Sequence, residues 1–138
     1  MNRYIEFRYI GYQNIEESGE RGTITDFQLE TQNLARSCHE SLILAILVDG
    51  PRHGYQLALE IEDRSGGSFH FNHGTLYPIL HKLESDGFID GSWAEPAGKR
   101  KRRQYALTAA GRKHLKRLRD GWNAYFESLF NVIGRSEA

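Results

Sequence analysis

The sequence has only one cysteine, Cys38. A single cysteine cannot close a disulfide within the chain, and it cannot supply a Cys-x-x-Cys metal or redox motif. Long apolar runs are absent as well, since no stretch approaches the roughly 18 apolar residues of a membrane span. Near the start, Glu6 and Arg8 interrupt any signal-peptide pattern. We therefore expect a cytoplasmic protein that makes no contact with membranes.

Recognisable catalytic motifs are also missing. The sequence contains no nucleophile elbow, no glycine loop that holds phosphates and no zinc-protease motif. Among the six histidines, His70 and His73 have i, i+3 spacing, and His53 and the pair Cys38-His39 precede them. Zinc ligands usually show tighter and repeated spacing than this. We expect no enzyme activity, no catalytic residue, no metal site and no cofactor.

The balance of charge differs between two parts of the chain, although the net charge is zero. Residues 1–98 contain 7 Lys or Arg against 15 Asp or Glu, a balance of −8. Residues 99–138 contain 11 against 3, a balance of +8. This division indicates contact with a polyanion through one face of an acidic body. A basic helix that is merely solvated would give the same count. The positions of the cations along the chain therefore have to decide between this interpretation and contact with a polyanion.

The patterning predicts a mainly α-helical fold with a small β-hairpin: a winged helix-turn-helix (residues 37–107) between an N-terminal extension (residues 1–36) and a C-terminal dimerisation helix (residues 108–138). The extension includes a helix-like stretch from Thr25. It is also rich in aromatic residues, and so much aromatic surface rarely stays exposed. We expect it to form an arm that docks on a second subunit through Tyr4, Phe7, Tyr9 and Tyr12.

Start and stop signals divide the predicted winged helix into its elements. A capping box, Ser37 to Glu40, is predicted to start the first helix, and Asp49-Gly50-Pro51 to end it. The second helix is expected from Gly54 to Ser65. The apolar side chains predicted to face the core are Leu42, Ile46 and Leu47 in the first helix and Tyr55, Leu57, Ala58 and Ile61 in the second.

The third helix has the clearest pattern. Asn72 is a good N-cap, Gly87 ends the helix, and the apolar residues between them recur at i, i+3, i+4 and i+7, namely Leu76, Ile79, Leu80 and Leu83. The period then changes to that of two strands, Phe88 to Trp93 and Arg103 to Leu107, which predict a hairpin.

Thr108 is predicted to cap the long final helix, whose apolar residues follow a coiled-coil-like spacing. We expect this seam to form a homodimer interface. An alternative is that its aromatic side chains enclose a flat small-molecule effector between two subunits, although aromatic stripes more often serve packing alone. The predicted interface residues are Leu115, Leu118, Trp122, Tyr125, Phe126, Leu129 and Phe130, and Val132 and Ile133 extend the stripe.

A helix followed by a cationic hairpin suits binding to double-stranded DNA. In a helix-turn-helix the second helix reads base edges with its N-terminal residues. The run from Lys99 to Arg103 is five consecutive cations, and it would form a wing that grips phosphates. The candidate DNA contacts are Tyr55, Asn72, His73, Thr75, Tyr77, His81, Lys82, Lys99, Arg100, Lys101, Arg102 and Arg103.

Three segments resemble the signature sequences of PadR-type transcriptional regulators: "ESLILAILVDGPRHGYQLALEI", "GTLYPILHKLESDGFI" and "RRQYALTAAGRKHL". The resemblance implies a homodimer with two winged helices that read a pseudo-palindrome, usually as a repressor. This chain is short and has an aromatic N-terminal extension, and in both respects it resembles a cyanobacterial circadian regulator of the family. That resemblance implies repression of a clock gene. The alternative is a ligand-sensing or protein-interaction winged helix with little direct DNA reading. For a DNA-binding protein we expect association with the nucleoid.

Overall fold

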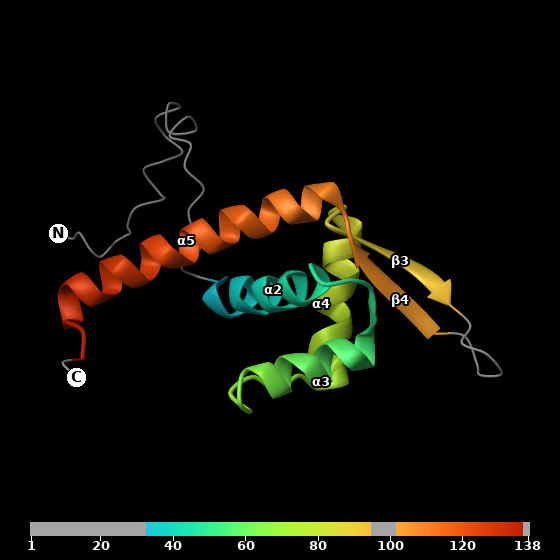
Figure 1. The fold of residues 1–138 in the computed structure, drawn as a ribbon, viewed down its shortest axis with the longest axis horizontal. Helices are drawn as coiled ribbons and strands as arrows, with labels where there is room; N and C mark the ends of the chain where they lie inside the picture. The colour runs from blue at the N-terminus through green and yellow to red at the C-terminus, as the bar shows by residue number, and fades with distance from the viewer. Residues whose placement is uncertain (1–32, 95–101, 137–138) are drawn as a thin grey trace.

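The computed structural model describes residues 33–94 and 102–136, and it confirms a mainly helical fold with a small antiparallel sheet (Figure 1). The predicted arm and the helix-like stretch from Thr25 lie outside the described residues. None of the described helices is both long and apolar enough to cross a membrane. The elements are α2 (Leu34–Leu47), β2 (Arg52–His53), α3 (Gly54–Arg64), α4 (His73–Ser85), β3 (Ile89–Ala94), β4 (Arg102–Leu107) and α5 (Ala109–Ile133).

Helix α2 begins earlier than the sequence pattern predicts. Its N-cap is Asn33, so Ser37 lies inside the helix, where its carbonyl accepts a hydrogen bond from the Ser41 hydroxyl at 2.7 Å. The predicted capping box is wrong because the helix is already formed at Ser37, and the Glu40 carboxylate lies 3.6 Å from both Arg36 Nε and His114 Nε2. The helix therefore crosses the predicted boundary between residues 36 and 37.

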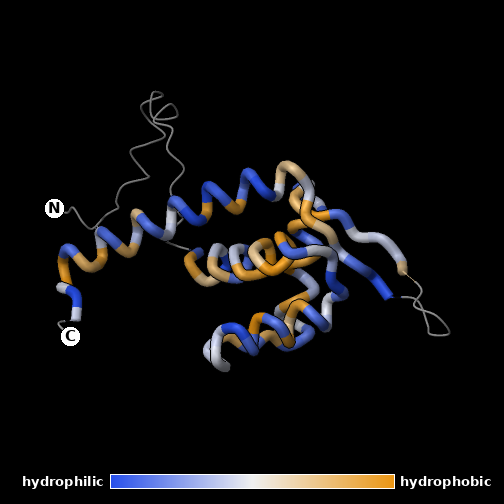
Figure 2. The backbone as a smooth tube through the Cα atoms, in the orientation of Figure 1, coloured by the Kyte–Doolittle hydropathy of each residue, from blue (hydrophilic) through white to orange (hydrophobic). Residues whose placement is uncertain are grey.

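The core lies around α2, which contacts α3, α4, β4 and α5. Because α2 is covered on several sides, its fully buried residues include Ile43 and Leu44, which the expected stripe omitted, while Leu42 is only partly buried. Along α5, the apolar parts of the backbone tube lie on the side that faces α2, as the hydropathy colouring shows (Figure 2). The buried set includes Ile46, Leu47, Leu57, Ile61, Leu76, Leu80, Leu83, Ile89, Leu115 and Leu118.

Helices α3 and α4 begin and end close to their predicted positions. The Asn72 side chain accepts a hydrogen bond from the Thr75 backbone N–H at 2.9 Å, as expected of an N-cap. After α4, Gly87 has a φ of 84°, which glycine adopts without steric cost. Tyr55 does not join the apolar side of α3, because it is 57% exposed.

The sheet has three strands in the order β2-β4-β3, one more than predicted. Strand β3 pairs with β4 from Ile89 opposite Leu107 to Ala94 opposite Arg102. The additional strand, β2, has two residues and pairs Arg52 with Tyr105. Two residues are too few for an alternating pattern to be recognised. Through β2, the turn between α2 and α3 is tied directly to the hairpin.

Helix α5 starts at the predicted cap and packs along α2 (Figure 1). The Thr108 hydroxyl accepts from the Gly111 N–H at 2.9 Å and donates to the Gly87 carbonyl at 2.8 Å. Farther along, Trp122 Nε1 donates to the Ser41 hydroxyl of α2 at 2.9 Å. The first half of α5 is therefore part of the core of the single chain.

Candidate nucleic-acid interface

The N-terminal ends of α3 and α4 meet the hairpin around an open hollow of about 350 Å³. Residues 53–55 and 73–77 thus share one surface with the wing. The residues that line the hollow come from β2, α3, α4, β3 and β4, and they are His53, Gly54, Tyr55, His73, Tyr77, Trp93, Arg102 and Arg103. Five of these were predicted to contact DNA, namely Tyr55, His73, Tyr77, Arg102 and Arg103.

Helix α4 owes its orientation to its apolar stripe. Leu76, Leu80 and Leu83 are buried in the core. This burial leaves the other side of the helix in solvent, with Thr75 half-buried. The exposed side chains on that side include Asn72 at the cap and His73, Tyr77, His81 and Lys82.

Tyr77 is held in place by its neighbours although it is 39% exposed. A Cβ atom on Gly54 would lie 2.6 Å from the Tyr77 hydroxyl oxygen, so the phenol ring lies directly against the first residue of α3. The imidazole of His73 is stacked with the same ring, with 5.7 Å between centroids and 9° between planes. The Tyr77 hydroxyl is therefore presented at the surface in a defined position.

The predicted cations of this surface differ in their availability. Lys99, Arg100 and Lys101 lie outside the described residues. Arg102 is exposed and pairs with no acidic side chain in the part of the chain that the structure describes. Arg103 is paired: its Nη2 lies 2.6 Å from Glu84 Oε2. Lys82 pairs with Asp86 one turn away, at 2.8 Å, although so exposed a pair is weak and can exchange for a phosphate.

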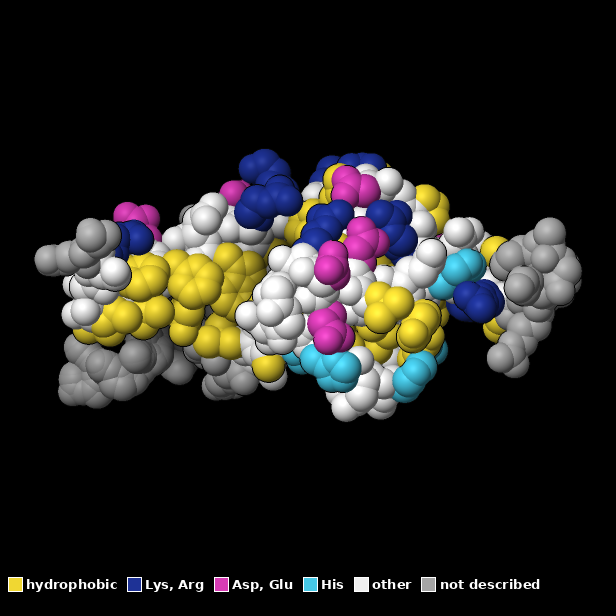
Figure 3. Space-filling model, turned by 60° about the horizontal axis from the view of Figure 1, so that its bottom comes forward, with side chains coloured by type: hydrophobic (Ala, Val, Ile, Leu, Met, Phe, Trp, Pro, Cys, Tyr) yellow, Lys and Arg dark blue, Asp and Glu magenta, His cyan; other side chains and the backbone are white. Residues whose placement is uncertain are grey.

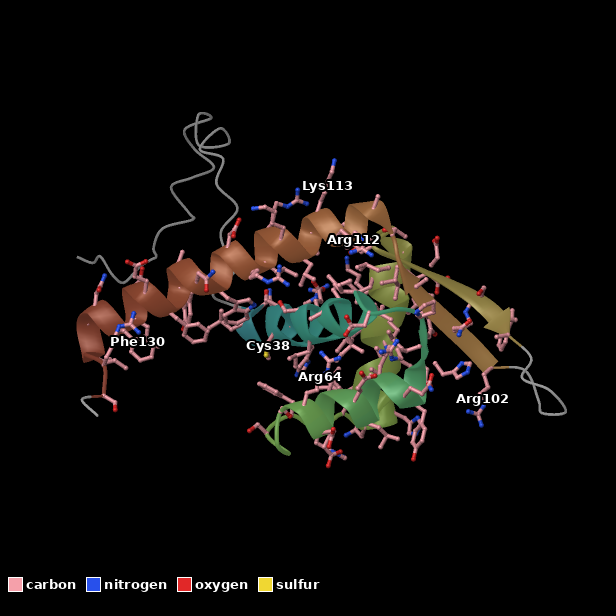
Figure 4. The ribbon with its side chains drawn as sticks, viewed as in Figure 1. Cys38, Arg64, Arg102, Arg112, Lys113 and Phe130 are labelled. Carbon is pink, nitrogen blue, oxygen red and sulfur yellow. The ribbon has the colours of Figure 1, made fainter. Side chains whose placement is uncertain are left out.

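Much of the positive charge of the C-terminal part lies away from this surface. Five exposed cations follow the outer side of the first half of α5: Arg112, Lys113, Lys116, Arg117 and Arg119. Lys113 projects from α5 on the side away from α3, whereas Arg102 lies at the wing (Figure 4). The charge balance of +8 is therefore not a measure of the wing alone.

The predicted dimer seam divides into a buried and an exposed part. Leu115 and Leu118 are only 5% and 2% exposed within one chain, because they pack in its own core, so they leave little surface for a second subunit. Beyond Trp122, apolar side chains gather on the surface of α5 (Figure 3). Phe126, Val132 and Ile133 are 44%, 85% and 63% exposed, while Tyr125, Leu129 and Phe130 are half-buried.

Two of the histidines considered as metal ligands have other partners in the structure. His70 Nδ1 lies 3.0 Å from Glu62, and His39 packs edge-on against Phe71. Burial lowers the pKa of His39 and raises the pKa of the Cys38 thiol. Within residues 33–94 and 102–136, no three His, Cys, Asp or Glu side chains gather as metal ligands would.

Comparison with known proteins places residues 43–117 within the sequence model of the family described as the PadR-like transcriptional regulators. The transcriptional regulator Rv3488 of Mycobacterium tuberculosis is 40% identical over 73 residues, which are 53% of this chain and 64% of that protein. The negative transcriptional regulator PadR of Bacillus subtilis is 30% identical over 73 residues, and the aligned part is 40% of its length. The match thus spans less than two thirds of each relative.

Solved structures confirm the fold class. A transcriptional regulator from Clostridium thermocellum superposes with a TM-score of 0.67 and 23% identity over 73% of this chain and 98% of that one. The structure of Bacillus subtilis PadR in complex with operator DNA superposes with a TM-score of 0.52 and 23% identity, over 72% of this chain and 48% of that chain.

Proposed function

The chain belongs to the PadR-like family of transcriptional regulators, and we propose that it binds operator DNA with α4 and the β-hairpin and represses transcription. The assignment to a family of regulators agrees with the expectation of a protein without enzyme activity. The observation that carries the proposal is the shared hollow, where the exposed N-terminal part of α4 lies beside Arg102 of the wing. A relative, Bacillus subtilis PadR, has been solved with operator DNA.

Each part of this surface has a separate task in the proposal. The N-terminal end of α4 reads base edges, with Thr75 and Tyr77 as the specificity residues. The wing supplies phosphate contacts through Arg102 and the cations from Lys99 to Lys101. Contacts to the DNA backbone do not depend on the base sequence. The wing should therefore control the affinity for any duplex, whereas Thr75 and Tyr77 should control the preference for one sequence.

The test is binding to duplexes selected from a randomised library with the unmodified protein. Arg102→Gln should weaken binding to selected duplexes and to poly(dI·dC) alike, and lower the salt slope by about 0.9 for each phosphate that is no longer neutralised. Thr75→Ala should change the preferred sequence and leave the slope unaltered. Two results would contradict the proposal. One is a Thr75→Ala protein that loses affinity equally for all duplexes, as Arg102→Gln is expected to do. The other is an Arg102→Gln protein with undiminished affinity.

We further propose a homodimer, because the end of α5 exposes an apolar surface on the single chain. In dimeric helix-turn-helix proteins the two reading helices lie in successive major grooves, about 34 Å apart, and we propose the same arrangement for this dimer. Phe126→Ser should shift the species seen in sedimentation toward the monomer. Lys113→Ser, on the cationic side of the same helix, is the matched control, and a dimer unchanged by Phe126→Ser would move the interface elsewhere.

The remaining parts of the proposal follow from DNA binding. A DNA-binding repressor would act in the cytoplasm, at the nucleoid. The resemblance to a circadian regulator extends the proposal to a clock gene as target, and the relatives named above give that extension no support. A ligand-sensing role would use the aromatic side chains near Trp122, but Trp122 already bonds to Ser41 of its own chain. An interaction module without DNA reading would leave Arg102 without a function.

A further inference from the structure

One ion pair joins the reading helix to the wing. Glu84 lies in the last turn of α4, and its Oε2 is 2.6 Å from Nη2 of Arg103 in β4. The two residues are 19 positions apart in the sequence. Among the ion pairs of the described residues, no other connects α4 with the hairpin. The side chains are 29% and 31% exposed, so water only partly screens their attraction.

The rest of the Arg103 side chain is held by strand β3. Arg103 pairs in register with Trp93, and its guanidinium lies over the indole ring, 5.4 Å from the ring centroid. A Cβ atom on Gly91 would lie 2.9 Å from both Nε and Nη2 of Arg103. The guanidinium therefore fills space that only glycine leaves open at position 91. The Arg103 guanidinium therefore contacts the Glu84 carboxylate, the Trp93 indole ring and the backbone at Gly91.

These interactions favour a fixed Arg103 over one that moves to a phosphate. To reach DNA, the guanidinium would have to give up a short charge-assisted hydrogen bond and its stacking on Trp93. The movement would also leave the partly buried Glu84 carboxylate without its cationic partner. Arg102, the next residue along β4, is exposed and has no such constraint.

We propose that Glu84 and Arg103 form a brace that fixes the wing relative to the reading helix, so that Arg103 is a positioning residue and not a phosphate ligand. The inference rests on the proposed DNA binding. A specific site must engage α4 and the wing at the same time, and a wing already held in place loses less conformational freedom on binding. Non-specific binding needs phosphate contacts only, so it depends less on the brace.

The test compares Glu84→Gln, Arg103→Gln and their double variant on a selected duplex and on poly(dI·dC), over a range of salt concentrations. Each single variant should reduce the ratio of selected to non-specific affinity about threefold to tenfold. The double variant should reduce it no further than either single variant, because both break the same brace. The salt slope of Arg103→Gln should match that of the unmodified protein, whereas the matched variant Arg102→Gln should have a lower slope.

A conservative variant separates the two roles of Arg103 further. Arg103→Lys keeps the charge, so a phosphate ligand would keep its slope and nearly all of its affinity. If Arg103 is part of a brace, the affinity ratio should still fall, because an ammonium does not reproduce the planar stacking of guanidinium on Trp93.

The opposite results would overturn the brace. They are a Glu84→Gln protein with an unchanged or increased affinity ratio, or an Arg103→Gln protein whose slope falls as that of Arg102→Gln does. If the unmodified protein selects no duplex at all, the proposed function fails and the brace fails with it. Thermal unfolding of each variant shows that the folded protein is being compared.

Discussion

Gly111 of α5 should tolerate substitution by alanine poorly. It lies in the first turn of the helix, where a Cβ atom would be 2.1 Å from the Phe88 carbonyl oxygen and 2.8 Å from Cδ1 of Leu107. The Leu107 methyl can move, but the Phe88 oxygen is backbone, and that same carbonyl accepts from the Thr108 N–H at 3.2 Å. Gly111→Ala must therefore push α5 away from the residues that lead into β3.

The expected cost follows from two opposing effects. Overpacking of a rigid site costs about 1–3 kcal/mol, and the clash with a backbone atom places this site at the upper end. Replacing glycine by alanine in a helix stabilises it by at most about 1 kcal/mol. We expect Gly111→Ala to lower the free energy of unfolding by about 2 kcal/mol. With a urea m-value of about 2 kcal/mol/M, the midpoint falls by about 1 M.

Gly74→Ala is the matched control, because Gly74 lies in the first turn of α4. A Cβ atom there would be 3.5 Å from Asn72 Oδ1, an ordinary contact. The urea midpoint of Gly74→Ala should equal that of the unmodified protein or be slightly higher. Both variants are to be unfolded in urea at one protein concentration, since a dimer makes stability depend on concentration. If Gly111→Ala is as stable as Gly74→Ala, the close packing of α5 on Phe88 is wrong.

Three further predictions concern other interactions. The hydrogen bond from Arg52 lowers the pKa of Glu60, so its stabilisation is complete above the ordinary glutamate pKa and is lost as pH falls through the lowered value. Glu60→Gln should thus flatten the acid side of the stability–pH curve, and an unchanged curve would exclude the pair as a contributor. Trp122→Phe and Ser41→Ala should each cost about 1 kcal/mol in thermal unfolding, and strict additivity in the double variant would contradict their hydrogen bond. Burial raises the pKa of Cys38, so a thiol reagent should react more slowly with the folded protein than with the urea-unfolded chain at neutral pH, and equal rates would contradict that.

The sequence predicted best those elements whose signals are local. The N-cap Asn72 and the stripe from Leu76 to Leu83 defined α4, because capping and 3.6-residue periodicity act within one helix. The start of α5 at Thr108 was predicted for the same reason. Each of these signals concerns residues only a few positions apart, and the backbone geometry follows from them directly.

Features that depend on tertiary structure were missed. Ser37 resembles a helix start in the sequence, but the helix begins upstream of it, directly after Asn33. Leu115 has the spacing of a dimer seam, yet it is buried against its own chain, and periodicity cannot tell which surface covers a stripe. Arg103 was grouped with its cationic neighbours because Glu84, 19 residues earlier, gives no local sign of the pair.

The central claim is that α4 and the wing bind a specific DNA sequence. Genome-wide mapping of the DNA bound by the protein in cells tests it most directly, with Thr75→Ala protein mapped in parallel. We predict inverted repeats whose half-sites are centred one helical turn, about 34 Å, apart, and a changed half-site sequence for Thr75→Ala. Bound regions that share no sequence, or a Thr75→Ala map identical to that of the unmodified protein, would contradict the claim.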